Sequence, residues 1–132
     1  MKLTNLYKEV LNEYVSEYGL KKIEQYLDDL FKSLHIDIEF SSHFLDRAND
    51  SRNGKEIESE EIINTFNRLY NKHGKGLTNF NKETEAVIMD LNNDINVPFV
   101  LTYDRNTKEF QLINKTIMRK KGFNTPNRKF KV

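Results

Sequence analysis

The spacing of apolar residues changes from mainly helical to strand-like near residue 82 of this chain of 132 residues, and this change constrains the fold more than any other feature. As far as about residue 82 the apolar residues recur every three or four positions, which is the spacing of one face of an α-helix. From Ala86 onward they follow the pattern of strands. Helices followed by strands predict an α+β domain, with helices packed on a small antiparallel β-meander.

The chain is expected to begin with a hairpin of two helices. Residues 5–18 and residues 21–34 each carry an apolar stripe at helical spacing. Gly19 lies between them and is suited to end the first helix in the left-handed conformation. Because the link is short, the two helices should run antiparallel and bury their aromatic side chains in the core.

Two further helices and a short strand are predicted before the sheet. The strand covers residues 36–40, where apolar and acidic residues alternate. The first of these helices follows Ser41-Ser42, and either serine can cap it. The second follows a capping Ser59 and ends at Gly74.

Three strands are predicted in the rest of the chain, at residues 86–91, 95–103 and 109–118. Pro98 lies in the second of them and, because it lacks an amide hydrogen, favours an edge strand or a bulge there. No internal repeat or low-complexity segment divides the chain, so we expect one domain over residues 1–132. Its predicted parts are a helical hairpin (1–35), the motif helices (36–82), the antiparallel sheet (85–121) and a basic tail (122–132).

The composition excludes several classes of protein. No apolar run approaches the ~20 residues of a membrane span, and the N-terminal residues form no apolar signal segment. The absence of cysteine excludes disulfides and thiolate zinc sites, and the three histidines have no spacing typical of a metal site. We therefore expect a cytoplasmic protein with no membrane partner, no metal and no cofactor.

Charge is distributed unevenly, although the net charge is only +1. Residues 1–114 carry 14 Lys and Arg against 20 Asp and Glu, whereas residues 115–132 carry seven Lys and Arg and no acid. Such a basic end is typical of contact with phosphate backbones or acidic partners. The alternatives are a solvated tail and a charged sheet edge that prevents aggregation.

The segment from Ser41 to Asn53 carries the residues best suited to chemistry. His43 and Arg47 are four residues apart and therefore share one face of the predicted helix, and Arg52 follows just after it. An imidazole beside two guanidinium groups suits phosphate-ester chemistry, since the arginines can hold a phosphate while the imidazole moves a proton. The alternative is a structural or surface histidine.

The same segment carries a resemblance to a known family. The run Ser41-x-His43-x-Leu45-Asp46-Arg47-Ala48 resembles the RegB endoribonucleases of T-even-type phages, small metal-independent RNases that cut phage messenger RNA at ribosome-binding sites. That family shares a fold with RelE-like toxins. The resemblance implies a phage-encoded enzyme of the host cytoplasm, with messenger RNA, in association with the ribosome, as its partner. It covers mainly residues 38–70.

The resemblance also implies roles for single residues. His43 stands where the family has a catalytic histidine, and Arg47 matches the arginine after it. The family's second active-site histidine follows a phenylalanine in the middle of the next helix. Here that phenylalanine is Phe66 and the next residue is Asn67, which can hold a phosphate oxygen but cannot transfer a proton.

The expected reaction is attack of the ribose 2′-hydroxyl on its own phosphate, with His43 as base. Arg47 and Arg52 would hold the phosphate, and Arg119, with Lys120 or Lys121, would neutralise charge from the sheet side. Phe123 and Phe130, interleaved with the basic residues, could stack on bases. The residues assigned to RNA binding are Asn67, His73, Thr116, Lys120, Lys121, Phe123 and Arg128.

A second interpretation comes from another class of protein. The chain could be a non-enzymatic module whose basic end docks on nucleic acid, on a ribosome, or on a phage or host protein. His43 and Arg47 would then be structural, with Arg47 paired to Asp46 or Asp50. A DNA-binding regulator is disfavoured because the predicted helices are acidic and offer no basic recognition face.

Overall fold

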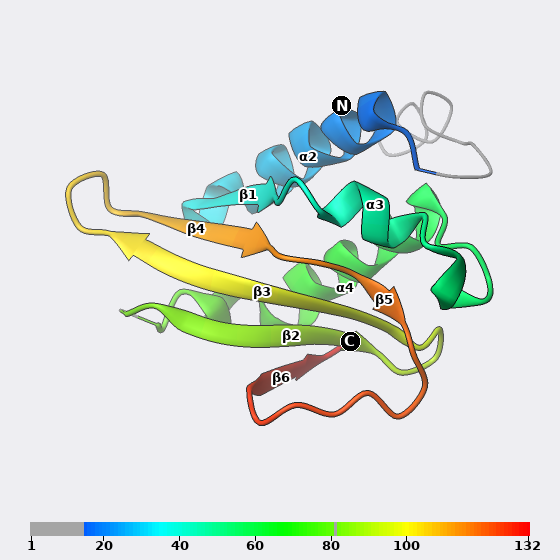
Figure 1. Cartoon of the computed structure of the whole chain (residues 1–132). Coiled ribbons are helices and arrows are strands. Elements are labelled where there is room, and N and C mark those ends of the chain that lie inside the picture. Colours follow the sequence, from blue (N-terminus) through cyan, green and yellow to red (C-terminus); the bar gives the residue numbers. More distant parts are fainter. Residues whose placement is uncertain (1–14, 81) are drawn as a thin grey trace.

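The computed structural model describes residues 15–80 and 82–132, and these form three helices and a six-stranded mixed sheet (Figure 1). This arrangement confirms the predicted α+β class. The helices are α2 (Glu17–Phe31), α3 (Phe44–Ala48) and α4 (Ser59–Leu77), with 3₁₀ turns η1 (Lys32–Leu34) and η2 (Ser51–Asn53). The strands are β1 (Ile36–Phe40), β2 (Thr84–Asp90), β3 (Ile95–Asp104), β4 (Glu109–Asn114), β5 (Met118–Arg119) and β6 (Arg128–Lys131).

The predicted pure antiparallel meander is wrong, because strands from outside the meander join both of its edges. The order across the sheet is β1-β4-β3-β2-β6, with β5 paired to β3 beyond the end of β4. β1 pairs in parallel with β4, and β6 pairs in parallel with β2. Parallel pairs join strands that are separated by long connections, whereas the prediction paired only strands that follow one another in the sequence. The expected basic tail, residues 122–132, therefore ends as a strand of the sheet.

Pro98 was predicted to lie in an edge strand or at a bulge, and the edge position is wrong because Pro98 lies in β3, the central strand. Its carbonyl accepts a hydrogen bond from the amide of Lys115 (2.9 Å), and its nitrogen therefore faces the same neighbour. On that side lie residues 115–117, a break that belongs to neither β4 nor β5. The prediction had placed one continuous strand over 109–118. The missing amide hydrogen falls at this break, which explains why a central strand accommodates the proline.

The start of α2 differs from the predicted helical hairpin. Ser16 is the N-cap of α2, and its side chain accepts a hydrogen bond from the amide of Gly19 (2.9 Å). Gly19 is thus buried in the first turn of a helix and does not end one. Most of the helix predicted at 5–18 falls on residues 1–14, outside the residues that the structure describes.

The two ends of α4 also differ from the predicted ones. Glu58, one residue before the expected Ser59, is the N-cap and takes part in a capping box. At the other end the helix passes through Gly74 and continues to Leu77. A side chain at Gly74 would bring its Cβ to 3.0 Å from Leu34 Cδ1, so the glycine here permits close helix packing.

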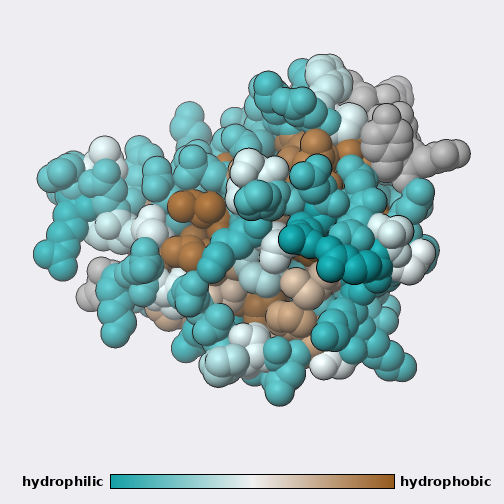
Figure 2. All heavy atoms as spheres, in the orientation of Figure 1, coloured by the Kyte–Doolittle hydropathy of each residue, from teal (hydrophilic) through white to brown (hydrophobic). Residues whose placement is uncertain are grey.

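The core lies between the sheet and α4, and α4 covers one face of the sheet. The helix α2 packs beside α4 and along β1 (Figure 1). Phe31, Phe66 and Phe99 are among the largest fully buried side chains of the core. Polar residues cover most of the face shown in Figure 2, where apolar residues reach the surface in small patches. Within the described part of the chain, no helix is both long and apolar enough to cross a membrane.

Asp28 covers part of the outer edge of β1, where its Oδ1 accepts a hydrogen bond from the amide of Ile38 (2.7 Å). Burial, together with the negative charges of Asp37 and Glu24, raises the pKa of this carboxyl to about 7, although the hydrogen bond opposes the shift. The folded state therefore favours the protonated carboxyl. Stability from this group is complete below about pH 4 and is lost as the pH rises toward the folded pKa.

We expect Asp28→Asn to raise the free energy of unfolding by about 1 kcal/mol near pH 8 and to change it little near pH 4. Asparagine keeps an oxygen for the Ile38 amide but carries no charge, and the partial exposure of Asp28 reduces the effect. Urea unfolding over this pH range measures it, with Asp29→Asn on the exposed side of α2 as the control. Parallel pH profiles for Asp28→Asn and the parent would contradict the assignment.

Candidate functional site

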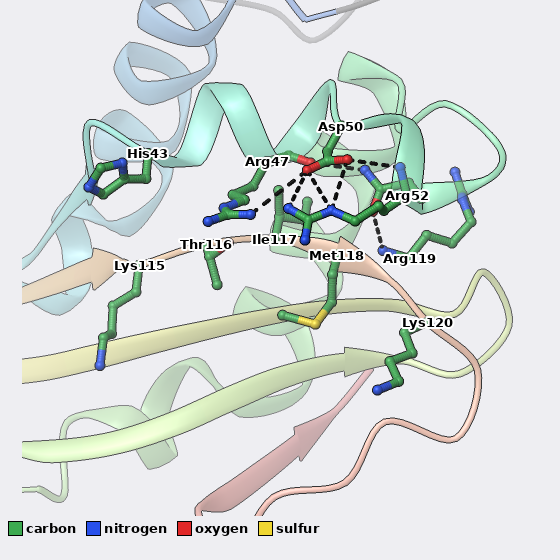
Figure 3. A pocket seen from close by; sticks show the side chains of 11 residues that line it. His43, Arg47, Asp50, Arg52, Lys115, Thr116, Ile117, Met118, Arg119 and Lys120 are labelled. Carbon is green, nitrogen blue, oxygen red and sulfur yellow. Dashed lines mark hydrogen bonds and ion pairs between the residues drawn. The ribbon is translucent and has the colours of Figure 1, made fainter.

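An open cleft of about 730 Å³ lies between α3 with η2 on one side and residues 115–120 on the other (Figure 3). Five of its lining residues are Arg or Lys, and one is acidic. The four residues predicted to act in chemistry all line it. The cleft is formed by His43, Arg47, Asp50, Arg52, Asn53 and residues 115–120.

The wall that carries His43 and Arg47 is a helix of only five residues, held down by its apolar side. Phe44 and Ala48 are buried, and the ring of Phe44 lies 4.6 Å from that of Phe40. The predicted serine cap is absent: His43 is the N-cap, and its side chain makes no capping bond. Ser41 instead donates its hydroxyl to the carbonyl of Lys115 (2.6 Å), which ties this wall to the opposite one.

Asn53 connects the two walls at the other end of the cleft. Its amide nitrogen donates to the carbonyls of Arg47 (2.9 Å) and Ala48 (3.3 Å), at the C-terminus of α3. Its Oδ1 accepts the backbone amide of Arg119 (3.0 Å), in β5. No functional role was assigned to Asn53 from the sequence. Nothing local could reveal a contact across 66 residues.

His43 lies at one end of the cleft, with Arg47 between it and the Asp50–Arg52 pair (Figure 3). It is an exposed residue, and its imidazole makes no hydrogen bond or ion pair with any residue in the described ranges. A group in this state can exchange protons with a ligand without first breaking an internal contact.

Asp50 neutralises part of the positive charge of the cleft. The guanidinium of Arg52 donates to it through Nε (3.0 Å) and Nη2 (2.7 Å), and Arg47 Nη1 lies 3.8 Å from the same carboxylate. The hydrogen bonds from Arg52 lower the pKa of Asp50 to about 2, so the carboxylate is ionised at neutral pH. Arg47, with a side chain 49% exposed, is the guanidinium less constrained by Asp50.

Arg119 reaches the cleft but serves mainly as its support. Its side chain is 11% exposed and pairs with Glu61 (2.7 Å) at the N-terminus of α4. The same guanidinium donates to three backbone carbonyls, those of Lys55 (3.2 Å), Glu56 (2.7 Å) and Asn93 (2.7 Å). With four hydrogen bonds already made, it has little capacity left for the phosphate that the sequence assigned to it.

The remaining wall contributes one accessible cation. Lys115 directs its ammonium to Glu85 (2.9 Å), on β2. Lys120 is exposed, and its side chain forms no hydrogen bond or ion pair within residues 15–80 and 82–132. Thr116 lies between them and lines the cleft, as Figure 3 shows.

Several residues expected to contact RNA lie away from this cleft. Asn67 accepts a hydrogen bond from the hydroxyl of Tyr26 (3.0 Å), between α4 and α2. The His73 ring is hydrogen-bonded to the carbonyl of Lys131 (2.8 Å), and Arg128 stacks over the ring of Phe80. Two others also lie outside it, Lys121 and Phe123.

Phe130, the second aromatic residue expected to stack on a base, is 5% exposed and belongs to the core. Its ring packs against those of His73 and Phe99. The alternation of basic and aromatic residues near the C-terminus is thus explained by a strand with one buried face.

Fold and cleft together define a small α+β domain with an open, cation-lined cleft. Comparisons of the chain with protein-family models, with curated proteins and with solved structures found no match. Among residues 15–80 and 82–132, no group of three or more His, Asp or Glu side chains is arranged to hold a metal ion.

Proposed function

We propose that the protein is a metal-independent endoribonuclease that holds the backbone of messenger RNA in this cleft. The observation that carries the proposal is the shared cleft of His43, Arg47 and Lys120, an imidazole and two cations without strong partners among the described residues. The same α3 segment carries the resemblance to the phage RegB endoribonucleases, which favours RNA over other phosphate esters.

The proposed reaction needs one base and nearby positive charge. The neutral imidazole of His43 accepts the proton of the ribose 2′-hydroxyl, and the 2′-oxygen then attacks the adjacent phosphorus. The bond to the 5′-oxygen breaks, and that oxygen takes a proton from solvent in the open cleft. Arg47 and Lys120 stabilise the negative charge of the pentavalent intermediate. The products carry a 2′,3′-cyclic phosphate and a 5′-hydroxyl.

Incubation of the purified protein with a mixed RNA pool in the presence of EDTA tests the proposal. We expect fragments with 2′,3′-cyclic phosphate and 5′-hydroxyl ends, which mass spectrometry identifies. The His43→Ala variant, purified in the same way, controls for contaminating nucleases. RNA that stays intact with the parent protein under all buffer conditions, or fragments formed equally by the variant, would refute the proposal.

Asp50 should limit the affinity of the cleft for RNA, because its carboxylate competes with phosphate for Arg52. We expect Asp50→Asn to tighten RNA binding about fivefold at low salt, with a salt dependence steeper by about 0.7 in log–log slope. In the parent, Asp50 Oδ1 accepts a hydrogen bond from the backbone amide of Arg52 (2.8 Å), and asparagine retains an oxygen that can accept this bond. Fluorescence anisotropy with labelled RNA measures both effects. Asp46→Asn, one turn earlier and outside the cleft, is the control.

A second candidate function is RNA docking without cleavage. It is favoured because His43 is the only imidazole among the described residues that line the cleft, while Arg119 and Asn67 are already bonded to Glu61 and Tyr26. This module would bind RNA through Arg47 and Lys120 as tightly with His43→Ala as without it. RNA binding with no cleavage by the parent protein would select this function.

A further inference from the structure

A second cavity of about 420 Å³ lies next to the cleft and shares one residue with it. Lys120 lines both, so the two lie side by side at this residue. The cavity is bounded by the turn between β2 and β3 and by the chain that leads from β5 to β6 (Figure 1). Among its lining residues are Asp90, Asp94, Lys120, Phe123, Lys129 and Lys131.

Among the described residues, the charged side chains that line this second cavity without an ion-pair partner are mainly positive. Lys129 and Lys131 are exposed on β6, and neither makes an ion pair within the described part of the chain. Lys129 donates to the neutral carbonyl of Thr125 (2.9 Å), which leaves its charge uncompensated. Of the two acids, Asp90 is buried and paired with Arg68, so Asp94 alone opposes the three lysines.

The cavity also offers surface for a base. Phe123 is half-buried and lines it, and Leu91, 57% exposed, projects from the neighbouring turn. Aromatic rings that flank lysines are the arrangement by which proteins hold single strands, with phosphates on the cations and bases on the rings. A base stacks in this way only where it is unpaired.

We propose that a single strand of RNA runs from the cleft, past Lys120, into the second cavity, where Phe123 stacks on a base flanking the cleaved position. Lys129 and Lys131 then neutralise the phosphates of these flanking nucleotides. The inference rests on the proposed function of the cleft and defines its substrate as single-stranded RNA that extends beyond the reacting dinucleotide.

Binding of two labelled RNA oligonucleotides, of about four and about twelve nucleotides, tests the inference by fluorescence anisotropy at several salt concentrations. All variants carry His43→Ala, so that the RNA stays intact and cleavage does not enter the result. The test variant is Lys129→Ala/Lys131→Ala. Its control is Lys72→Ala/Lys75→Ala, which removes the same charge from exposed positions of α4 that line neither cavity.

For the longer RNA we expect the test variant to bind about tenfold more weakly, with a log–log salt slope smaller by about 1.4, or ~0.7 for each lost phosphate contact. The short RNA and the control should change less than about twofold. Phe123→Leu, which keeps an apolar side chain, should weaken binding of the longer RNA by about fivefold or more.

Equal losses in the test and control variants would overturn the inference and leave the cleft assignment intact. Equal losses for both RNA lengths would also overturn it, because the second cavity would not then contact flanking nucleotides. If the parent chain and every variant fail to bind either RNA, both this inference and the proposed function are refuted.

Discussion

Replacing Arg119 with alanine is expected to lower the free energy of unfolding by about 3 kcal/mol. The substitution leaves the Glu61 carboxylate, 14% exposed, without its partner, and it removes the donors to the carbonyls of Glu56 and Asn93. Breaking a buried ion pair from one side is costly because the remaining charge stays desolvated. Urea denaturation of the parent and the variant measures the change.

Lys120→Ala provides the matched control, because it removes a neighbouring positive charge that has no hydrogen-bond or ion-pair partner among the described residues. Its effect on stability should stay within about 0.5 kcal/mol. Arg119→Lys should fall between the two, since lysine keeps the charge beside Glu61 but lacks the planar set of five donors. A loss below about 1 kcal/mol for Arg119→Ala would show that this network does not hold the cleft together.

The second large effect concerns chemistry. His43→Ala is expected to lower the rate of RNA cleavage by at least about a hundredfold, because a single positioned proton-transfer group contributes about 10²–10⁴ in rate. The fold should persist, since His43 is exposed and its side chain makes no capping hydrogen bond to α3. Single-turnover cleavage of a labelled RNA measures the rate, and anisotropy checks that binding remains within about threefold.

A histidine outside the cleft gives the control for this prediction. His35 is exposed and adopts a left-handed backbone conformation (φ 57°), which asparagine also adopts readily, so His35→Asn should preserve the fold. It should leave the cleavage rate unchanged. Equal rates for the parent and His43→Ala would remove His43 from the mechanism.

The elements that local sequence predicts well are those whose apolar spacing is set by one buried face. The strand at residues 36–40 has the predicted bounds, and α4 buries Ile62, Phe66 and Leu69 as its spacing indicated. The helix ends were less predictable. Gly74 looked like a terminator but is used for close packing against Leu34, a contact that only the tertiary structure defines.

The sheet order could not be predicted from the same local patterns. The parallel pairing of β1 with β4 joins Ile36 to Phe110, and that of β2 with β6 joins Ile88 to Phe130. These paired residues lie far apart in the sequence. The alternation of apolar residues within a strand does not determine which other strand will pair with it. Pro98 shows the same limit, because the break that accommodates it lies on another strand.

The candidate site was predictable only where its residues lie close together in the sequence. His43, Arg47 and Arg52 lie within one short segment, so helical spacing was enough to place them near one another. Arg119 was predicted from charge alone, and charge does not distinguish a ligand-binding guanidinium from one already saturated by Glu61 and backbone carbonyls. Lys120, its neighbour, is exposed, lines the same cleft and makes no side-chain hydrogen bond or ion pair among the described residues.

The most direct test of the account uses a set of DNA strands that each contain a single ribonucleotide, with every base represented. Only that position offers the 2′-hydroxyl that His43 is proposed to deprotonate. We predict that the parent protein cuts these strands in EDTA after the ribonucleotide and leaves a 2′,3′-cyclic phosphate, whereas His43→Ala leaves them whole. Cleavage at deoxynucleotides, or strands that the parent binds and never cuts, would contradict the account.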